Sequence, residues 1–418
     1  MNTRFIMTVL VFLFLFFAPS LSFGEEKNGC IVCHSELSDN LVIPVQQWKE
    51  SVHSRAGVEC QDCHGGNPRS MDMAESMNRA KGFKGRPSAI EIPQLCGGCH
   101  SDVRKMRQYN LRTDQLAEYK TSIHGKRLFE KKDPNVATCI SCHGTHDIKK
   151  KDDPRSRVYK TNVPEMCGSC HSNKEKMKGY KIPTNQLDEY MESHHAKVLY
   201  GKIPGKNPML APNCADCHGI HGATPPGVDE VVNVCGNCHS VTQGYFKEGP
   251  HFAAMKRVGV PKCINCHGNH KIEFPSISMF SNGDKGICKN CHEEKSLQIE
   301  RSKEIYTLLV NLENQIKEAE KGLKEAEASG KYLEDLYLKL REAKDKLIEA
   351  GPVSHSLNVA KIKLLAEEAT DITKKINSDV NEIRKELSMR KNTWLVIAGL
   401  TLFTAFLIGV KLYMIEKG

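Results

Sequence analysis

No cysteine of this 418-residue chain stands outside a C-x-x-C pair, although the chain contains 18 cysteines. A disulfide scaffold does not need its cysteines in such pairs, so the arrangement argues against one. Segments with the period-two alternation of β-strands are also scarce. These two absences favour a helical, loop-rich chain whose cysteines do something other than form disulfides.

A histidine follows every C-x-x-C pair, which makes nine C-x-x-C-H motifs. This is the attachment signature of c-type haem: the cysteines form two thioethers and the histidine binds the iron from the proximal side. Paired C-x-x-C units can also bind zinc, but zinc gives no reason for a histidine after each pair. We therefore expect nine covalently attached c-type haems. The attachment cysteines are Cys30, Cys33, Cys60, Cys63, Cys96, Cys99, Cys139, Cys142, Cys167, Cys170, Cys214, Cys217, Cys235, Cys238, Cys263, Cys266, Cys288 and Cys291. The proximal histidines are His34, His64, His100, His143, His171, His218, His239, His267 and His292.

The motifs alternate between two types along the chain. A motif of the first type is followed by serine or glutamate, and these motifs start at Cys30, Cys96, Cys167, Cys235 and Cys288. A motif of the second type is followed by glycine, and these motifs start at Cys60, Cys139, Cys214 and Cys263. The alternation gives four two-motif repeats and one closing motif.

Further histidines recur at fixed places in these repeats and are candidate distal ligands. One precedes each second-type motif, at His53, His124, His195 and His251; another follows three of these motifs in "CHGxH", at His146, His221 and His270. The "CHGxH" histidine is too close along the backbone to its own motif to reach the opposite face of the same haem. We expect it to bind the iron of another haem, which would hold the two haems close together. The eighth candidate, at the predicted start of a helix, is His355.

Eight candidates for nine irons leave one distal position unassigned. His195, rather than its neighbour His194, aligns with the other upstream histidines, and "CHGGN" has Asn67 where later repeats have histidine. Three assignments stay open: His194 fills the position, a nearby methionine fills it, or one iron is five-coordinate. Two imidazoles suit outer-sphere electron transfer, methionine raises the potential, and an open position permits substrate binding. The methionines are Met71, Met73 and Met77.

The two ends of the chain predict export and a membrane anchor. Residues 1–24 contain Arg4, an apolar run and small residues at Ser22 and Gly24, which is typical of a cleaved signal peptide. Residues 392–415 are apolar and long enough to cross a membrane. Basic residues before this span oppose the positive-inside tendency, but haem attachment occurs on the exported side. We expect the haem region at the periplasmic face of the cytoplasmic membrane.

The sequence between the last motif and the anchor is helical in character. Leucine, isoleucine and alanine recur at three- and four-residue spacing over residues 293–391, interrupted near 328–330 and 351–352. This pattern predicts three long helices in a bundle or hairpin, with a coiled stalk as the alternative. The expected domains are a haem region over 25–292, the helical segment over 293–391 and the anchor. The predicted fold class is all-α and haem-rich, with little regular sheet.

The net charge of +9 does not indicate a nucleic-acid partner. The ionised propionates of nine haems would offset the basic excess, whereas nucleic-acid binding needs a clustered basic face.

The nine motifs, the paired repeats and the late helical histidine resemble periplasmic multihaem c-type cytochromes of anaerobic respiratory bacteria. Within these, the pattern is similar to the superfamily of cytochrome c554, hydroxylamine oxidoreductase and pentahaem nitrite reductase. In that comparison His355 matches the late distal ligand, but none of the motifs ends in the lysine typical of the nitrite reductases.

The resemblance implies an electron carrier rather than a substrate-converting enzyme. Its expected partners are a membrane quinol dehydrogenase or cytochrome on one side and a periplasmic reductase or cytochrome on the other. The alternative is an oxidoreductase that converts a small nitrogen or sulfur species, such as nitrite, hydroxylamine or a tetrathionate-like compound, at one open haem. The sequence does not indicate haem order, haem potentials, the direction of electron flow or the oligomeric state.

Overall fold

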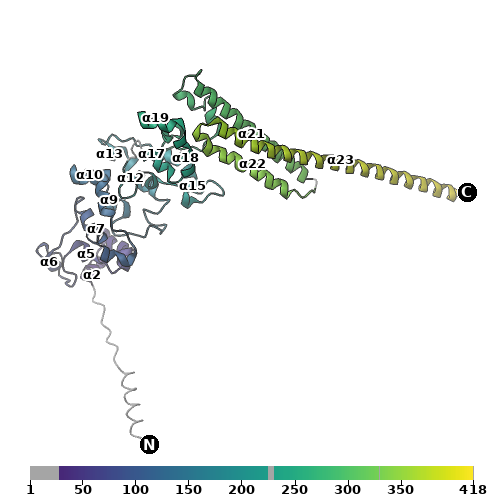
Figure 1. Cartoon of the computed structure of the whole chain (residues 1–418). Coiled ribbons are helices and arrows are strands. Elements are labelled where there is room, and N and C mark those ends of the chain that lie inside the picture. Colours follow the sequence, from purple (N-terminus) through teal and green to yellow (C-terminus); the bar gives the residue numbers. More distant parts are fainter. Residues whose placement is uncertain (1–27, 225–229, 329, 418) are drawn as a thin grey trace, which may run out of the picture. The chain divides into compact units, whose positions relative to one another are not determined.

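The structure of the protein is a computed structural model that describes residues 28–224, 230–328 and 330–417 (Figure 1). Within these ranges all regular structure is helical and no β-strand occurs, so the predicted all-α class is confirmed. The predicted signal peptide lies outside the described residues.

Short helices and 3-10 turns make up the motif-bearing region. In chain order they are α2 (Gly29–Glu36), η1 (Asp39–Leu41), α3 (Ile43–Lys49), α4 (Val52–Arg55), α5 (Cys60–His64), α6 (Met73–Ser76), η2 (Arg79–Lys81), α7 (Ile92–His100), α8 (Val103–Met106), η3 (Arg107–Tyr109), α9 (Gln115–Thr121), α10 (Ile123–Glu130), α11 (Cys139–His143), α12 (Val163–His171), α13 (Lys174–Met177), α14 (Gln186–Glu192), α15 (His194–Leu199), η4 (Pro208–Leu210), α16 (Cys214–His218), α17 (Glu230–Gly236), α18 (Ser240–Glu248), α19 (Pro250–Val258), α20 (Cys263–His267), η5 (Ile277–Phe280) and η6 (Cys288–Asn290).

The chain forms two compact units. The first holds the described residues through Leu187 together with 198–224, and the second holds 188–197 and the described residues from 230 onward. Six motifs fall in the first unit. The last three motifs fall in the second, together with the long helices that follow them.

The backbone explains why the two motif types differ in the residue after the histidine. Each second-type motif is a five-residue helix, and the glycine that ends it has a φ between +68° and +87°. That conformation is strained for any residue with a Cβ, so glycine is required there. The first-type helices α7 and α12 instead continue into Ser101 and Ser172 at ordinary helical angles. The alternation of the two motif types in the sequence thus corresponds to an alternation in the backbone conformation directly after the motif histidine.

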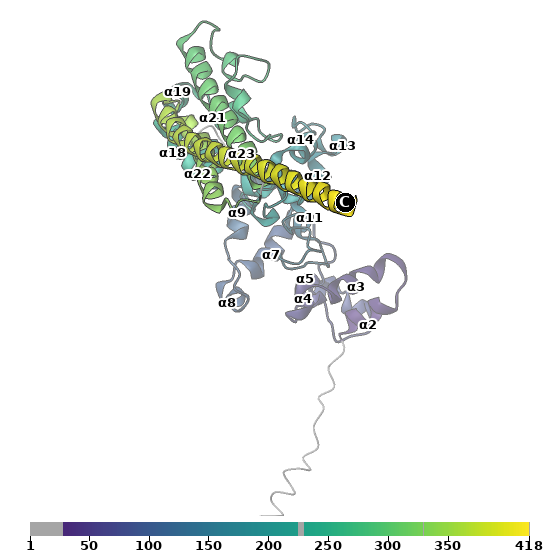
Figure 2. The ribbon, with the colours of Figure 1, turned by 90° about the vertical axis from the view of Figure 1, so that its right-hand side faces the viewer.

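Three long helices form the predicted bundle. They are α21 (Leu297–Glu327), α22 (Glu334–Val353) and α23 (Val359–Lys417), joined after α22 by η7 (Ser354–Ser356), and they lie side by side in both views (Figures 1 and 2). Leu323, Ala343 and Ile376 are fully buried where the three helices meet. This core confirms the three-helix bundle that the periodicity predicts.

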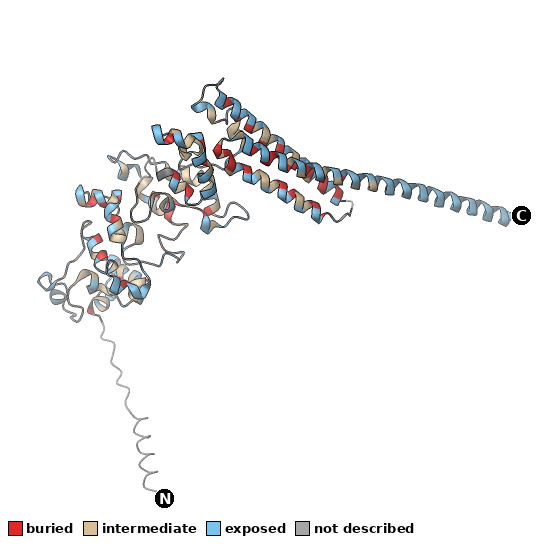
Figure 3. Ribbon diagram, in the orientation of Figure 1, coloured by how far each residue is buried: buried red, intermediate tan, exposed pale blue. Residues whose placement is uncertain are grey.

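Helix α23 is buried at one end and exposed at the other. Its first half packs Ile362, Ala369 and Ile376 into the bundle, whereas the side chains from Trp394 onward are exposed (Figure 3). By length and composition this is the helix among the described residues that can cross a membrane. The predicted C-terminal anchor therefore continues directly from a bundle helix.

The bundle core predicts a clear difference between two leucines. We expect Leu323→Ala, which empties a fully buried site, to lower the free energy of unfolding by roughly 2–5 kcal/mol. Leu338→Ala removes the same atoms from a side chain on α22 that is 56% exposed, and should cost little. Urea unfolding followed by far-ultraviolet circular dichroism in detergent measures both. Equal losses for the two variants would contradict this packing.

Candidate haem sites

Seven motif histidines lie opposite another histidine in the described structure. In seven cases the two imidazole rings face each other with similar centroid separations. These are 6.1 Å for His53–His100, 6.2 Å for His64–His146, 6.0 Å for His124–His171, 6.2 Å for His143–His221, 6.3 Å for His195–His239, 6.1 Å for His251–His292 and 5.9 Å for His267–His355.

This separation fits an iron held between two imidazoles. With each metal–nitrogen bond about 2 Å long, rings on opposite sides of one metal have centroids about 6 Å apart. The angles between the ring planes range from 13° to 65°. The pairs therefore have a common centroid separation but no common angle between the rings, as aromatic stacking would require. The residues present therefore fit haem iron with two histidine ligands.

The pairs follow a register. Four first-type motif histidines face a histidine from the preceding repeat, as in His100 with His53 and His171 with His124. The second-type motif histidines His64, His143 and His267 face a histidine further along the chain. His146 and His221 therefore lie opposite a motif of the preceding repeat, and His355 closes the series opposite His267. Each of these seven sites is completed by a neighbouring part of the chain.

Backbone carbonyls set the orientation of several imidazoles. Nδ1 of His64 lies 2.8 Å from the Gly85 oxygen, Nδ1 of His355 lies 3.1 Å from the Gly351 oxygen, and Nδ1 of His34 lies 3.4 Å from the Leu41 oxygen. A carbonyl can only accept, so Nδ1 carries the proton in each case and Nε2 keeps the lone pair that a metal requires.

Burial favours the neutral form of four histidines at these sites. Desolvation, together with the facing His221, lowers the pKa of His143 to about 4. Desolvation is also the largest cause lowering the pKa of His53, His124 and His355. Neutral imidazole is the form that binds metal, so the sites are suited to ligation at neutral pH.

A buried serine starts each of three helices that carry an upstream histidine. Ser51, Ser122 and Ser193 have no exposed surface, and each side chain accepts the backbone N–H three residues on. This is an N-cap, which satisfies an N–H that the first helical turn leaves unpaired. The distal candidate is always the second residue after the cap, so the cap fixes where the imidazole emerges.

The first residue after each capping serine is hydrogen-bonded to the loop that follows a "CHGxH" histidine; we call this contact the joint between the two segments. The backbone N–H groups of Val52, Ile123 and His194 donate to the carbonyls of Ile148, Ala223 and Ile272, at 2.9, 3.1 and 2.8 Å. Each acceptor is the second residue after His146, His221 or His270. A single backbone hydrogen bond thus connects the helix that carries an upstream distal candidate with the loop that follows a "CHGxH" distal candidate.

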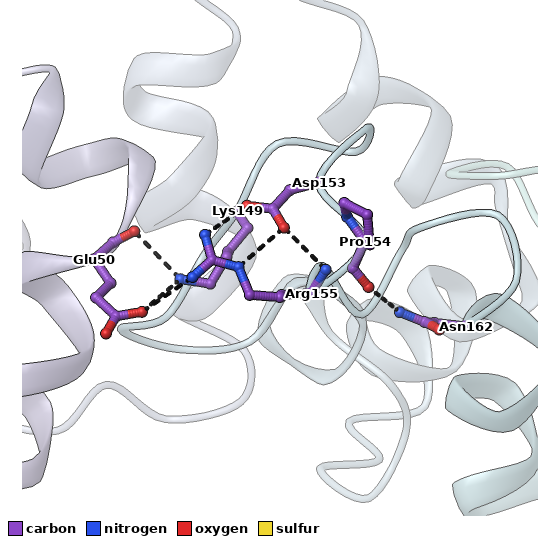
Figure 4. A network of polar contacts seen from close by, with 6 residues as sticks. All are labelled: Glu50, Lys149, Asp153, Pro154, Arg155 and Asn162. Atoms are coloured by element: carbon purple, nitrogen blue, oxygen red, sulfur yellow. Dashed lines mark hydrogen bonds and ion pairs between the residues drawn. The ribbon is translucent and has the colours of Figure 1, made fainter.

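Charged side chains reinforce this joint in the first repeat (Figure 4). Lys149 Nζ donates to the backbone oxygen of Glu50 at 3.3 Å and lies 3.4 Å from its carboxylate. Arg155 reaches the same carboxylate at 3.5 Å and also pairs with Asp153 at 3.0 Å. Neither the capping role of the serine nor these contacts between repeats could be predicted from the spacing of the histidines.

We expect loss of the cap to weaken the joint. Ser122→Ala removes the acceptor of the Gly125 N–H and should lower the free energy of unfolding by roughly 0.5–2 kcal/mol. Ser101→Ala, at an exposed C-cap, should change it by much less. Guanidinium unfolding followed by the low-spin haem absorbance measures both variants, and an unchanged midpoint for Ser122→Ala would contradict the role.

Cysteines of consecutive motifs lie close to one another in space. Within repeats, hydrogen bonds join the thiols of Cys96 and Cys139 and those of Cys167 and Cys214; this raises the pKa of Cys96 and Cys167. Across neighbouring repeats, Cys142 interacts electrostatically with Cys170. In the second unit the hydrogen bond from Cys235 lowers the pKa of Cys263 to about 7. Successive attachment points are therefore neighbours within each unit.

Zinc binding by the same cysteines does not fit this arrangement. Over the residues that the structure describes, no three His, Cys, Asp or Glu side chains converge as a zinc site would need.

Comparison with known proteins agrees with these features. Residues 52–172 match the cytochrome c3 family. The chain is 24% identical over 306 residues to the multiheme cytochrome MtrA of Shewanella baltica, which covers 65% of this chain and 78% of that protein. It is 20% identical over 289 residues to the C-type polyheme cytochrome OmcB of Geobacter sulfurreducens, which covers 58% of this chain and 36% of that protein. The chain thus spans about a third of OmcB. No solved structure matches. With its attachment motifs and facing imidazoles, the chain is therefore a multihaem c-type cytochrome related to these proteins.

Proposed function

We propose that this protein relays electrons through nine haems, as a membrane-anchored cytochrome at the periplasmic face of the cytoplasmic membrane. It would connect a quinol-linked membrane partner with periplasmic electron acceptors in anaerobic respiration. Haem iron between two imidazoles supplies reversible one-electron chemistry without an open position for substrate. The protein's part is to hold these groups in sequence, fix their ligands and tether them.

The observation that carries this proposal is the combination of facing imidazoles and ordered attachment cysteines. Seven motif histidines have an opposed histidine whose ring centroid lies 5.9–6.3 Å away. Within each unit, cysteines of consecutive motifs also interact with one another. A chain that brings its haem sites together in sequence order supports passage of electrons along it, because electron transfer weakens steeply with separation.

The proposed location depends on both ends of the chain. The exposed apolar part of α23 supports an anchor, and the predicted signal peptide supports export of the haem region. We also propose the finer relationship to the cytochrome c554 and hydroxylamine oxidoreductase superfamily. The entry of His355 from the segment between two long helices supports it.

The full chain, produced in a host that matures c-type cytochromes, tests the proposal. We expect a mass increase of nine haems over the mature polypeptide and, after reduction with dithionite, complete reoxidation by a soluble ferric chelate. Nitrite and hydroxylamine should not be consumed by the reduced protein. Fewer haems, a fraction that the chelate cannot reoxidise, or turnover of either nitrogen compound would contradict the relay.

A further inference from the structure

The site at Cys30, Cys33 and His34 differs from the other first-type sites because no earlier histidine is available as its distal ligand. Four first-type motif histidines, His100, His171, His239 and His292, face a histidine that precedes them in the chain. No histidine precedes His34 in the sequence. The pairing that completes the other four sites, with an earlier histidine, therefore gives the His34 site no distal ligand.

Asn67 does not mark the incomplete site. Its counterparts His146 and His221 face second-type motifs of the preceding repeat, at His64 and His143, and not a motif of their own repeat. His64 already faces His146. The asparagine stands where a histidine would serve an earlier repeat, so a histidine at this position would not complete a motif of the first repeat.

His194, which the repeat pattern does not use, is engaged elsewhere. His194 is the first residue of α15, one residue before the distal candidate His195. Its ring packs against Phe274 with centroids 4.9 Å apart, and its backbone N–H donates to Ile272. These contacts place His194 in the joint between a distal helix and a "CHGxH" loop, a position that valine and isoleucine fill in other repeats.

The surroundings of His34 nevertheless suit a haem. Its Nδ1 faces the Leu41 carbonyl, which leaves Nε2 to bind a metal. Leu37, Leu41 and Ile43, just after the motif, are 41%, 54% and 41% exposed. An apolar ring attached at Cys30 and Cys33 would give these side chains a surface to pack against. The chain thus supplies the attachment cysteines, a proximal ligand and nearby apolar side chains, but the register supplies no second imidazole.

We infer that the haem held by Cys30, Cys33 and His34 is the one without a distal histidine, and that its open face binds a small exogenous ligand such as a diatomic molecule or a small anion. This inference rests on the proposed nine-haem protein and assigns its single open position. In contrast, the opposite end of the series is closed, because His355 from η7 faces His267.

Carbon monoxide and electron paramagnetic resonance of the full-length holoprotein test the inference. In the ferric protein about one haem in nine should be high-spin, and the ferrous protein should bind one carbon monoxide per chain. Cys30→Ala/Cys33→Ala should abolish both signals and leave the other haems low-spin. The matched variant Cys288→Ala/Cys291→Ala removes the last motif instead and should retain both.

Two further variants separate the competing assignments. Asn67→His should leave the high-spin signal and carbon monoxide binding unchanged; their loss would place the open position elsewhere and overturn the inference. Met71, Met73 and Met77 are 55%, 74% and 43% exposed and offer the competing ligand. If the wild type is entirely low-spin and the triple leucine variant becomes high-spin, methionine ligation replaces the inference.

The failure of this inference can be told from failure of the proposed function. A purified protein with nine haems, all low-spin and indifferent to carbon monoxide, overturns the open site and leaves the relay intact. A protein without covalent haem overturns both.

Discussion

Replacing His221 with alanine will leave one additional haem with a single imidazole. The ring of His221 lies 6.2 Å from that of His143, and Nδ1 of His221 lies 3.5 Å from the Glu118 carboxylate. No other side chain in the "CHGIH" loop can take its place, because the residues beside it are isoleucine and glycine. We expect the high-spin ferric signal to rise by about one haem per chain, since loss of a strong axial ligand changes the spin state.

His194→Ala is the control for this change. It removes the same side chain from a position where the ring packs on Phe274, while the motif histidine His239 faces the adjacent residue His195. Low-temperature electron paramagnetic resonance should show no additional high-spin haem. If His194→Ala produces the high-spin haem and His221→Ala does not, the assignment of distal ligands by register is wrong.

Replacing Gly249 with alanine will disturb a haem site far away in sequence. Gly249 is the N-cap residue of α19, and a Cβ at this position would lie 2.9 Å from the backbone oxygen of His355 and 3.1 Å from that of Ser356. These are backbone atoms of η7, whose Ser356 hydroxyl donates to Val353 at 2.7 Å, so they cannot rotate away as a side chain could. The segment must shift, and His355 shifts with it.

We expect Gly249→Ala to lower the free energy of unfolding by roughly 1–3 kcal/mol, as overpacking does. It should also convert part of the haem of His267 to the high-spin form, because its distal histidine is displaced. Gly244→Ala, in the preceding helix α18, adds the same methyl group where no atom lies within 4 Å. That control should be neutral or slightly stabilising, since alanine favours helix over glycine by about 1 kcal/mol. Equal spectra for both variants would show that Gly249 does not position His355.

The Gly249 contact also explains how the series of repeats closes. In earlier repeats the first N–H of the distal helix donates to the loop of a "CHGxH" motif, as Ile123 does to Ala223. In the last repeat Pro250 has no N–H to donate, and η7 lies against Gly249 in place of such a loop. The helical bundle therefore supplies both the packing and the histidine that a further repeat would have supplied.

The amino-acid sequence by itself determined the helical class, the haem chemistry, the two motif types, the bundle and the apolar anchor. These features are local: a cysteine pair with its histidine, a glycine at positive φ and an apolar period each need only a few neighbouring residues. The candidate distal histidines were also visible, because their spacing repeats.

Only the tertiary structure decided which histidine faces which motif. His53 and His100, or His64 and His146, are brought together by serine caps and by backbone bonds such as Val52 to Ile148. Such contacts join residues from different repeats, and spacing along the chain does not encode their partners. For that reason the sequence pointed to Asn67 as the gap, whereas the register of facing rings led us to infer that it lies at His34.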